Sequence, residues 1–297
     1  MRTTESAAVG WSAQANAFAC GQAAARAAAN KLAGAEVRCV IAFASSWFDQ
    51  QLLLEGVRSV FDAIPVVGGS TAGEITANGP HTHSCAVLAI TGEDLALSIG
   101  HAGGLEEAPR QAGYLTAQQA VKTFGTKPRR GMIFFGDGLL TGYAEVLRGM
   151  QEVLGTSSLV TGALMADELR FNQTTQYAGD RVLTRGIVGL LLGGACSIGV
   201  GVEHGFEPIS KPRHVTRAHA NILYELDGQP ASSVYEEYFG SGRDGLTQQI
   251  GLSRRLVAYP LGVQLDNTGH FLLRNIMAFG HGGLRIDLSV KIHKIQN

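Results

Sequence analysis

The stretch Val66-Val67-Gly68-Gly69-Ser70-Thr71-Ala72-Gly73-Glu74-Ile75 is the starting point for interpreting this chain. Its valines predict the end of a short buried strand, and glycines, hydroxyl residues and one carboxylate follow directly. Glycine lets a ligand approach the main chain closely, while hydroxyls and carboxylates can hold a polar or cationic group. Because α/β proteins bind ligands where buried strands end, the stretch predicts a binding site. A tight turn with no ligand is the competing interpretation of so short a motif.

The composition is that of a soluble globular protein. The 297 residues are 45% hydrophobic and 16% charged, enough for one large domain or two ordinary ones. With 24 basic and 25 acidic residues, the chain has no charge excess that would attract nucleic acid or an anionic membrane. No apolar run has the length of a spanning helix, and the N-terminus is too polar for a signal peptide. The four cysteines are widely spaced, which argues against a disulfide framework or zinc ribbon. We therefore expect a cytoplasmic protein.

The order of elements predicts a mixed α/β fold. Helices with apolar residues at helical spacing are predicted at 12–31, 47–62, 114–124 and 143–154. Near-continuously apolar runs at 37–43 and 132–135 predict buried strands. The runs 85–90 and 95–99 predict a hairpin around a polar turn. Beyond 213 the sequence changes to short strands and one helix, which predicts a separate α+β region.

Two parts of the sequence resemble each other. At one constant offset, Leu53 and Val57 match Val146 and Met150, and the same offset matches Glu74 to Asp167. This predicts a duplication, with repeats at about 37–104 and 131–205 that each contain a strand, a helix, a strand, an acidic turn and a hairpin. Chance similarity between two α/β units is the alternative explanation. Duplicated halves are expected to face each other, with both carboxylates lining a shared cleft.

Several motifs, taken in order, resemble a known family. The run 69–75 is similar to the Gly-Ser-Thr-Ala-Gly-Glu-Ile stretch of FIST domains, and 162–167 falls at that family's second glycine-rich acidic turn. The run 216–231 resembles the opening of the FIST C-terminal domain, and 259–263 and 273–276 continue the resemblance. Met165-Ala166 departs from the family's Ala-Gly before the acid. The alanine-rich start of the chain predicts an N-terminal helix at 1–34, and the resemblance implies a FIST N-like sensory domain at 35–213 and a partial FIST C-like domain at 214–297.

The resemblance also implies a function. FIST domains are described as bacterial-type intracellular sensory modules that bind small ligands such as amino acids, and some relatives resemble haem-containing nitric-oxide sensors. A signalling protein such as a histidine kinase or chemoreceptor is the implied partner. We therefore expect a small-ligand sensor with no catalytic residue and no metal. The expected ligand-binding residues are Ser70, Thr71, Gly73, Glu74, Asp137 and Asp167.

The chemistry of these side chains leaves alternatives open. Glu74 and Asp167 could receive an ammonium group, while Ser70, Thr71 and backbone N–H groups take a carboxylate. Alternatively, nearby backbone N–H groups or an arginine satisfy both acids, which then only hold the turns closed.

Two other functional classes are weaker on the sequence alone. A hydrolase would use Ser70, but the run around it lacks the second glycine of a nucleophile elbow. A haem sensor would need an axial ligand; His204, His214 and His219 are candidates, and His81-x-His83 could bind a metal.

Overall fold

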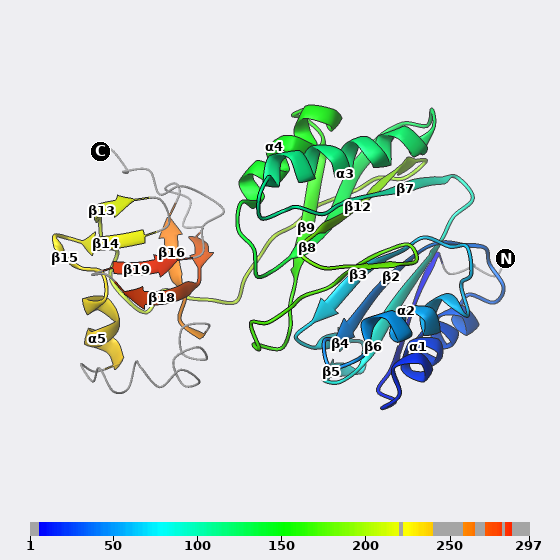
Figure 1. The fold of residues 1–297 in the computed structure, drawn as a ribbon, viewed down its shortest axis with the longest axis horizontal. Helices are drawn as coiled ribbons and strands as arrows, with labels where there is room; N and C mark the ends of the chain where they lie inside the picture. Colours follow the sequence, from blue (N-terminus) through cyan, green and yellow to red (C-terminus); the bar gives the residue numbers. More distant parts are fainter. Residues whose placement is uncertain (1–5, 220–221, 240–257, 265–270, 281–282, 287–297) are drawn as a thin grey trace. The chain divides into compact units, whose positions relative to one another are not determined.

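The computed structural model describes residues 6–219, 222–239, 258–264, 271–280 and 283–286 (Figure 1). The chain divides into two compact units, Met1–Gly201 and Val202–Asn297. The expected α/β class with mixed sheets is confirmed. Among the described residues, no helix combines the length and apolar character needed to cross a bilayer.

The first unit contains two repeats of one topology. The first repeat runs through β1 (Ala7–Ser12), α1 (Ala17–Lys31), β2 (Val37–Ser45), α2 (Gln50–Arg58), β3 (Val66–Thr71), β4 (Glu74–Thr76), β5 (Gly79–His81) and β6 (Cys85–Thr91). The second runs through β7 (Leu95–Ala102), α3 (Pro109–Phe124), β8 (Arg129–Asp137), α4 (Tyr143–Leu154), β9 (Leu159–Met165), β10 (Gln176–Ala178), β11 (Arg181–Leu183) and β12 (Ile187–Gly194). Their sheets have the matching strand orders β1-β6-β2-β3 and β7-β12-β8-β9. Within these orders, only the pairs β2–β3 and β8–β9 are parallel.

The two repeats differ in their hairpins. The β10–β11 hairpin of the second repeat crosses over and pairs with β3, which extends the first sheet to six strands. The β4–β5 hairpin of the first repeat instead forms a small sheet of its own. One edge of the first sheet is therefore covered, while β9 remains the last strand of the second sheet.

The unit has four layers, with helices outside and the two sheets packed face to face (Figure 1). Helices α1 and α2 cover the outer face of the first sheet, and α3 and α4 cover that of the second. Between the sheets lies an apolar core that includes Ile41, Val67, Phe135 and Leu190. Strands buried on both faces are near-continuously apolar, which is the pattern expected from the sequence.

This apolar core corrects the expectation of an open cleft between the repeats. Residues of both sheets share one buried cluster, so the repeats are joined across their faces. A ligand shared by both repeats would have to bind where the strands of the sandwich end.

Glycines let the layers approach closely, and they recur at equivalent places in both repeats. A Cβ atom on Gly56 would lie 2.1 Å from the carbonyl oxygen of Phe18, and one on Gly149 would lie 2.0 Å from that of Arg110. Both glycines therefore sit at the contact between the two helices of their repeat. These matching contacts support duplication independently of the sequence similarity.

The first and second helices begin later than expected. Asn16 caps α1 by accepting a 2.9 Å hydrogen bond from the N–H of Ala19, and Asp49 caps α2 in the same way. Ser12 and Ser45, the serines at or near the predicted helix starts, belong to strands instead. Asparagine and aspartate are favoured N-cap residues, so the sequence does contain the residues that mark the two helix starts.

The predicted hairpin of 85–90 with 95–99 is wrong. Strands β6 and β7 follow each other closely, but they lie in different sheets, and β7 pairs with β12. Strand β7 opens the second repeat, as β1 opens the first. The repeats consequently begin earlier than 37 and 131, and the predicted N-terminal helix is an integral part of the first repeat.

The number of positions that separates equivalent residues of the two repeats is one larger in the β3 and β9 strands than in the helices. Gly68 lies opposite Ala42 and Gly162 lies opposite Phe134, and a Cβ on either glycine would strike the facing carbonyl oxygen. Val66 and Val160 likewise face the helices. Continuing this strand alignment matches Glu74 to Glu168 rather than to Asp167. A one-residue shift moves a strand's side chains to the opposite face, so only the structure identifies the correct pair.

The second unit is a small α+β assembly. It contains β13 (Val215–His219), β14 (Ile222–Leu226), β15 (Gln229–Pro230), α5 (Ser233–Phe239), β16 (Leu261–Gln264), β17 (Phe271–Arg274), β18 (Ile276–Gly280) and β19 (Gly283–Ile286). Leu223, Leu226, Val234 and Ile276 belong to its core. The polar run 241–249, predicted to be a loop, lies outside the described residues.

Candidate functional site

The candidate site lies where the parallel strands β2 and β3 end and meet the end of β9. Ser70 makes this junction: its backbone C=O accepts a hydrogen bond from Ala166 N–H (3.0 Å), and its hydroxyl donates to the Ala166 carbonyl (2.8 Å). The crevice outside the carboxyl ends of parallel strands is the usual ligand site of α/β sheets. Here this position brings together side chains from both repeats.

Glu74 is a buried carboxylate at this junction. Glu74 is only 3% exposed, and the hydroxyls of Thr71 and Ser84 donate hydrogen bonds to its two carboxylate oxygens. Burial raises the pKa of Glu74 above its usual range; the two hydroxyls act in the opposite direction, and the charge of Glu168 raises it further. The predicted residues Thr71 and Glu74 are thus in direct contact.

Glu168 is the second carboxylate of the site, and sequence reasoning missed it. The hydroxyl of Ser45 donates a 2.5 Å hydrogen bond to its Oε1, and its side chain is 15% exposed. His83 Nε2 lies 3.9 Å from its Oε2. Among the described residues, no lysine or arginine forms a salt bridge with Glu74 or Glu168. Two interacting acids therefore share a site without a permanent positive partner.

An aromatic and cationic rim borders the acids. Trp47, which is 62% exposed, contacts the edge of the His83 ring, with the ring centroids 5.5 Å apart. The guanidinium carbon of Arg170 lies 4.8 Å from the centroid of the Trp47 ring. Arg170 also donates a 2.6 Å hydrogen bond to the hydroxyl of Ser46. The exposed guanidinium can receive an anionic group beside the two carboxylates.

The backbone beside the site adopts unfavourable angles. Glu168, Leu169 and Phe171 have φ values of 60°, 62° and 51°, and His83 has a φ of 50°. Non-glycine residues rarely adopt positive φ, and such strain clusters at ligand sites and switch regions. The loop after β9 therefore holds Glu168 in place at a conformational cost.

The other predicted residues have structural contacts. The hydroxyl of Ser70 also accepts a 2.9 Å hydrogen bond from Thr175 N–H, so it is engaged as donor and acceptor. Gly73 has a φ of +145°, which glycine tolerates best. The carboxylate of Asp137 accepts hydrogen bonds from the N–H groups of Leu139 and Arg185. No hydrogen bond among the described residues joins Asp137 to Glu74.

Asp167 organises the strained loop. Its carboxylate, in a residue that is 3% exposed, accepts hydrogen bonds from the N–H groups of Phe171 (3.1 Å), Asn172 (2.7 Å) and Gln173 (3.2 Å). This is the alternative in which backbone N–H groups satisfy the acid. Asp167 therefore holds the loop that carries Glu168 and Arg170.

We expect Asp167→Ala to lower the free energy of unfolding by about 1–3 kcal/mol, because three backbone N–H groups of the loop lose the carboxylate that accepts their hydrogen bonds. Urea denaturation followed by circular dichroism measures this loss. Glu207→Ala, at an exposed carboxylate, is the matched control and should change stability by less than about 0.5 kcal/mol. Equal stability of both variants would show that the carboxylate does not hold the loop.

Three of the histidines considered as metal or haem ligands, His81, His83 and His204, have other contacts. His81 stacks on Trp11, with ring centroids 3.8 Å apart, and contacts the Thr76 hydroxyl. His204 Nε2 lies 3.0 Å from the carbonyl oxygen of Phe271. Within the part of the chain that the structure describes, no group of three or more metal-ligating side chains is present.

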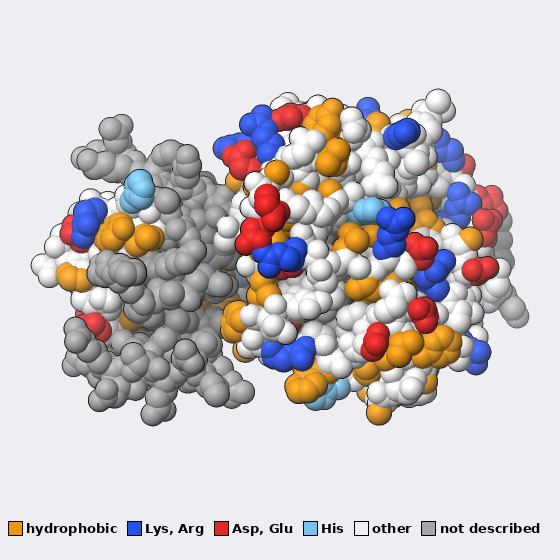
Figure 2. All heavy atoms as spheres, viewed as in Figure 1, with side chains coloured by type: hydrophobic (Ala, Val, Ile, Leu, Met, Phe, Trp, Pro, Cys, Tyr) orange, Lys and Arg blue, Asp and Glu red, His pale blue; other side chains and the backbone are white. Residues whose placement is uncertain are grey.

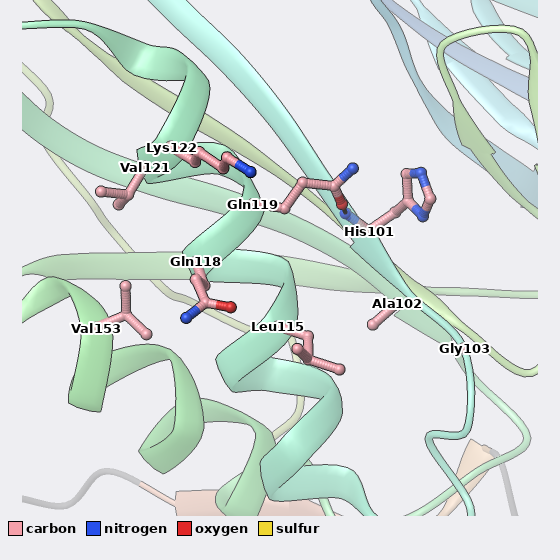
Figure 3. A pocket seen from close by; sticks show the side chains of 9 residues that line it. All are labelled: His101, Ala102, Gly103, Leu115, Gln118, Gln119, Val121, Lys122 and Val153. Atoms are coloured by element: carbon pink, nitrogen blue, oxygen red, sulfur yellow. Dashed lines mark hydrogen bonds between the residues drawn. The ribbon is translucent and has the colours of Figure 1, made fainter.

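An open depression of about 860 Å³ lies elsewhere, against α3 and the end of β7 (Figure 3). Leu115 and Gln118 from α3, Val153 from α4 and His101 from β7 line it. The side chain of Gln119 accepts a hydrogen bond from the His101 N–H. Since no carboxylate lines this depression, we place the candidate site at the strand ends.

Comparison with known proteins decides the family. The FIST N domain matches residues 38–229, which is more than half of the chain. This chain belongs to the FIST family. FIST domains are sensory domains found in signal-transduction proteins, and the resemblance inferred from the glycine-rich turns is confirmed.

The similar curated proteins are themselves uncharacterised. A protein of Mycobacterium tuberculosis is 32% identical to this FIST protein over 125 residues, covering 40% of this chain and 31% of its own length. A Methanocaldococcus jannaschii protein is 33% identical over 110 residues, covering 36% of this chain and 20% of its own. The match thus spans a third or less of these relatives.

One solved structure is a distant neighbour. A cyanuric acid hydrolase from A. caulinodans aligns with a TM-score of 0.31 and 17% identity, covering 65% of this FIST protein and 68% of the hydrolase. At this level of similarity, the match carries no argument about activity.

Proposed function

We propose that this FIST protein is a cytoplasmic sensor that binds a small amine-bearing molecule, such as an amino acid, at the Glu74–Glu168 site. The observation that carries the proposal is the pair of acids with which no described lysine or arginine forms a salt bridge. Two like charges at one site favour either a shared proton or a bound cation. A ligand ammonium would satisfy both carboxylates with charge-assisted hydrogen bonds.

The surroundings favour a zwitterion. Arg170 offers an anion-binding group next to the acids, and Trp47 offers an exposed aromatic face for an apolar side chain. An amino acid carries all three features, since it has an ammonium, a carboxylate and a side chain. The Glu168–Arg170 loop would contact the ligand with two of its residues, so binding would bias its conformation.

A sensory role fits the site better than hydrolysis through Ser70. The Ser70 hydroxyl donates to the Ala166 carbonyl and accepts from the Thr175 N–H. A nucleophilic serine needs an adjacent base, whereas these bonds hold two strands together. The change at the Glu168–Arg170 loop would be read by a signalling protein such as a histidine kinase or chemoreceptor.

A thermal-shift screen tests the proposal, using free amino acids and the matched N-acetyl amino acids. A free amino acid at a hundred times its Kd should stabilise the protein by about 2.7 kcal/mol, while the acetylated counterpart should not. The affinity should rise with pH, because a proton on Glu74 competes with the ammonium. Equal shifts with the free and acetylated forms, or no shift with any amine, would overturn the proposal.

A further inference from the structure

The outer edge of β9 is a strand edge that no other described strand pairs with. Natural sheets usually protect their edges with charged side chains, with very short strands or by covering them. The two large sheets of the first unit have four edges, formed by β1, β11, β7 and β9. Three of these edges are protected in one of these ways.

The other edges show how protection is achieved here. On β1, the ammonium of Lys31 donates a 2.7 Å hydrogen bond to the outward carbonyl of Val9. On β7, the outward N–H of His101 donates a 2.8 Å hydrogen bond to the Gln119 side chain. Strand β11 has three residues and carries Arg181. Edge protection is thus the rule in this unit.

The β9 edge has none of these features. The seven residues Leu159–Met165 carry no charge and no proline. The N–H of Asp137 bonds to the carbonyl of Gly186, directly before β12. Successive residues of a strand point their N–H and C=O groups to opposite sides, so those of Phe134 point toward β9, where Phe134 lies opposite Gly162. Alternation then turns the N–H and C=O groups of Val160, Gly162 and Leu164 outward. Among the described residues, no hydrogen bond reaches these groups.

The duplication shows that an additional strand can pair with the outer edge at this position of the sheet. In the first repeat, the equivalent strand β3 is covered by β10, which pairs with it antiparallel at Val67, Gly68 and Gly69. Gly68 of β3 is the structural equivalent of Gly162 of β9. Strand β10, which covers β3 of the first sheet, comes from the second repeat. The corresponding β4–β5 hairpin of the first repeat pairs only within itself and does not cover β9.

We propose that β9 is the dimerisation edge of this protein, at which two copies pair antiparallel about a twofold axis at Gly162. Pairing of β9 with itself places Val160 opposite Leu164 of the second copy, and the two Gly162 residues exchange N–H···O bonds. Every side chain along the strand is uncharged, so no like charges oppose each other. The two four-stranded sheets would become one continuous sheet of eight strands.

Exposed apolar side chains extend the same edge. Leu164 is 43% exposed, and Leu169 and Phe171 in the loop just after β9 are 48% and 50% exposed. Strand pairing alone buries little area, and a stable interface needs about 1,200–2,000 Å². These side chains supply apolar area next to the paired strands, which favours a second copy over an isolated peptide.

Light scattering coupled to size exclusion tests the oligomeric state of the full chain. We expect the mass of a dimer for the wild type and the mass of a monomer for Leu164→Pro, which removes an outward N–H. Leu164→Lys keeps that N–H but adds a charge to the edge, and it should raise the dimer dissociation constant at least tenfold. Val9→Pro is the matched control, because its outward N–H lies on the protected edge of β1, and it should remain a dimer.

Cross-linking tests the register even if the proline variants fail to fold. About the proposed axis, position 161 of one copy faces position 163 of the other as a non-hydrogen-bonded pair, where Cα atoms are about 4.5 Å apart. That distance suits a disulfide. Thr161→Cys/Ala163→Cys should therefore form a covalent dimer on mild oxidation, in a Cys196→Ser background because the other three cysteines are buried. A monomeric wild type, or a dimer that neither cross-links nor responds to Leu164→Lys, overturns the proposal.

Discussion

Replacing Glu74 with glutamine is expected to abolish the response to amines while the protein stays folded. An ammonium paired with a buried carboxylate loses about 2–5 kcal/mol when the carboxylate is removed, which corresponds to at least a thirtyfold loss of affinity. Glutamine has nearly the same shape, and its oxygen can accept a hydrogen bond from Thr71 or Ser84. Isothermal titration calorimetry with the amino acid found by the screen measures the loss.

The same variant should change how stability depends on pH. Burial raises the pKa of Glu74 in the folded state above its unfolded value. The folded state therefore binds the proton more tightly, and the resulting stability is complete below the unfolded pKa and is lost as pH rises through the folded pKa. Because Glu74→Gln cannot ionise, its stability relative to the wild type should increase with pH. Urea denaturation at several pH values measures the difference.

Matched substitutions make the result specific. Glu168→Gln should weaken amine binding, because it removes the second carboxylate, whereas Glu55→Gln on the exposed face of α2 should change neither binding nor the pH dependence of stability. If Glu74→Gln bound the amino acid as tightly as the wild type, the ammonium would not sit on this carboxylate. If it also kept the wild-type pH dependence, Glu74 would not be the buried titrating group.

Replacing Gly149 with alanine is expected to destabilise the protein by about 1–3 kcal/mol, although alanine is the better helix former. The added Cβ would lie 2.0 Å from the carbonyl oxygen of Arg110, which belongs to the backbone of α3 and cannot move aside alone. Helix α4 would have to move away from α3. Gly56→Ala should have a similar effect at the equivalent contact between α2 and α1.

Chemical denaturation of the three alanine variants checks this expectation. The control is Gly103→Ala, because no atom lies within 4 Å of its added Cβ and its φ is not positive. This variant should change the free energy of unfolding by less than about 0.5 kcal/mol. A Gly149→Ala protein as stable as Gly103→Ala would show that the close helix contact does not constrain the fold.

The near-equal numbers of acidic and basic residues are visible on the surface. Both signs are interspersed on the face of the first unit seen in Figure 2, without a large patch of either. The proposed recognition of a small ligand would therefore rest on the local Glu74–Glu168 site rather than on a long-range field.

The sequence determined much of the architecture because local patterns specify it. Apolar runs located buried strands such as β2 and β8, and the glycine-rich turn after β3 located Thr71 and Glu74 at a strand end. The duplication was also visible, because helix residues such as Leu53 and Val146 match at one offset. Local periodicity and turn chemistry carry these features, so no distant contact is needed to recognise them.

Tertiary structure alone decided the partner strands and the second acid. Strand β7 looked like the second half of a hairpin, because a short turn precedes it, yet its partner β12 lies far along the chain. The pairing of Glu74 with Glu168 depends on a one-residue difference between the helix and strand alignments, which reverses the face of every side chain. Backbone N–H groups satisfy Asp167, whereas no lysine or arginine in the described ranges pairs with Glu74. This difference depends on contacts between distant segments.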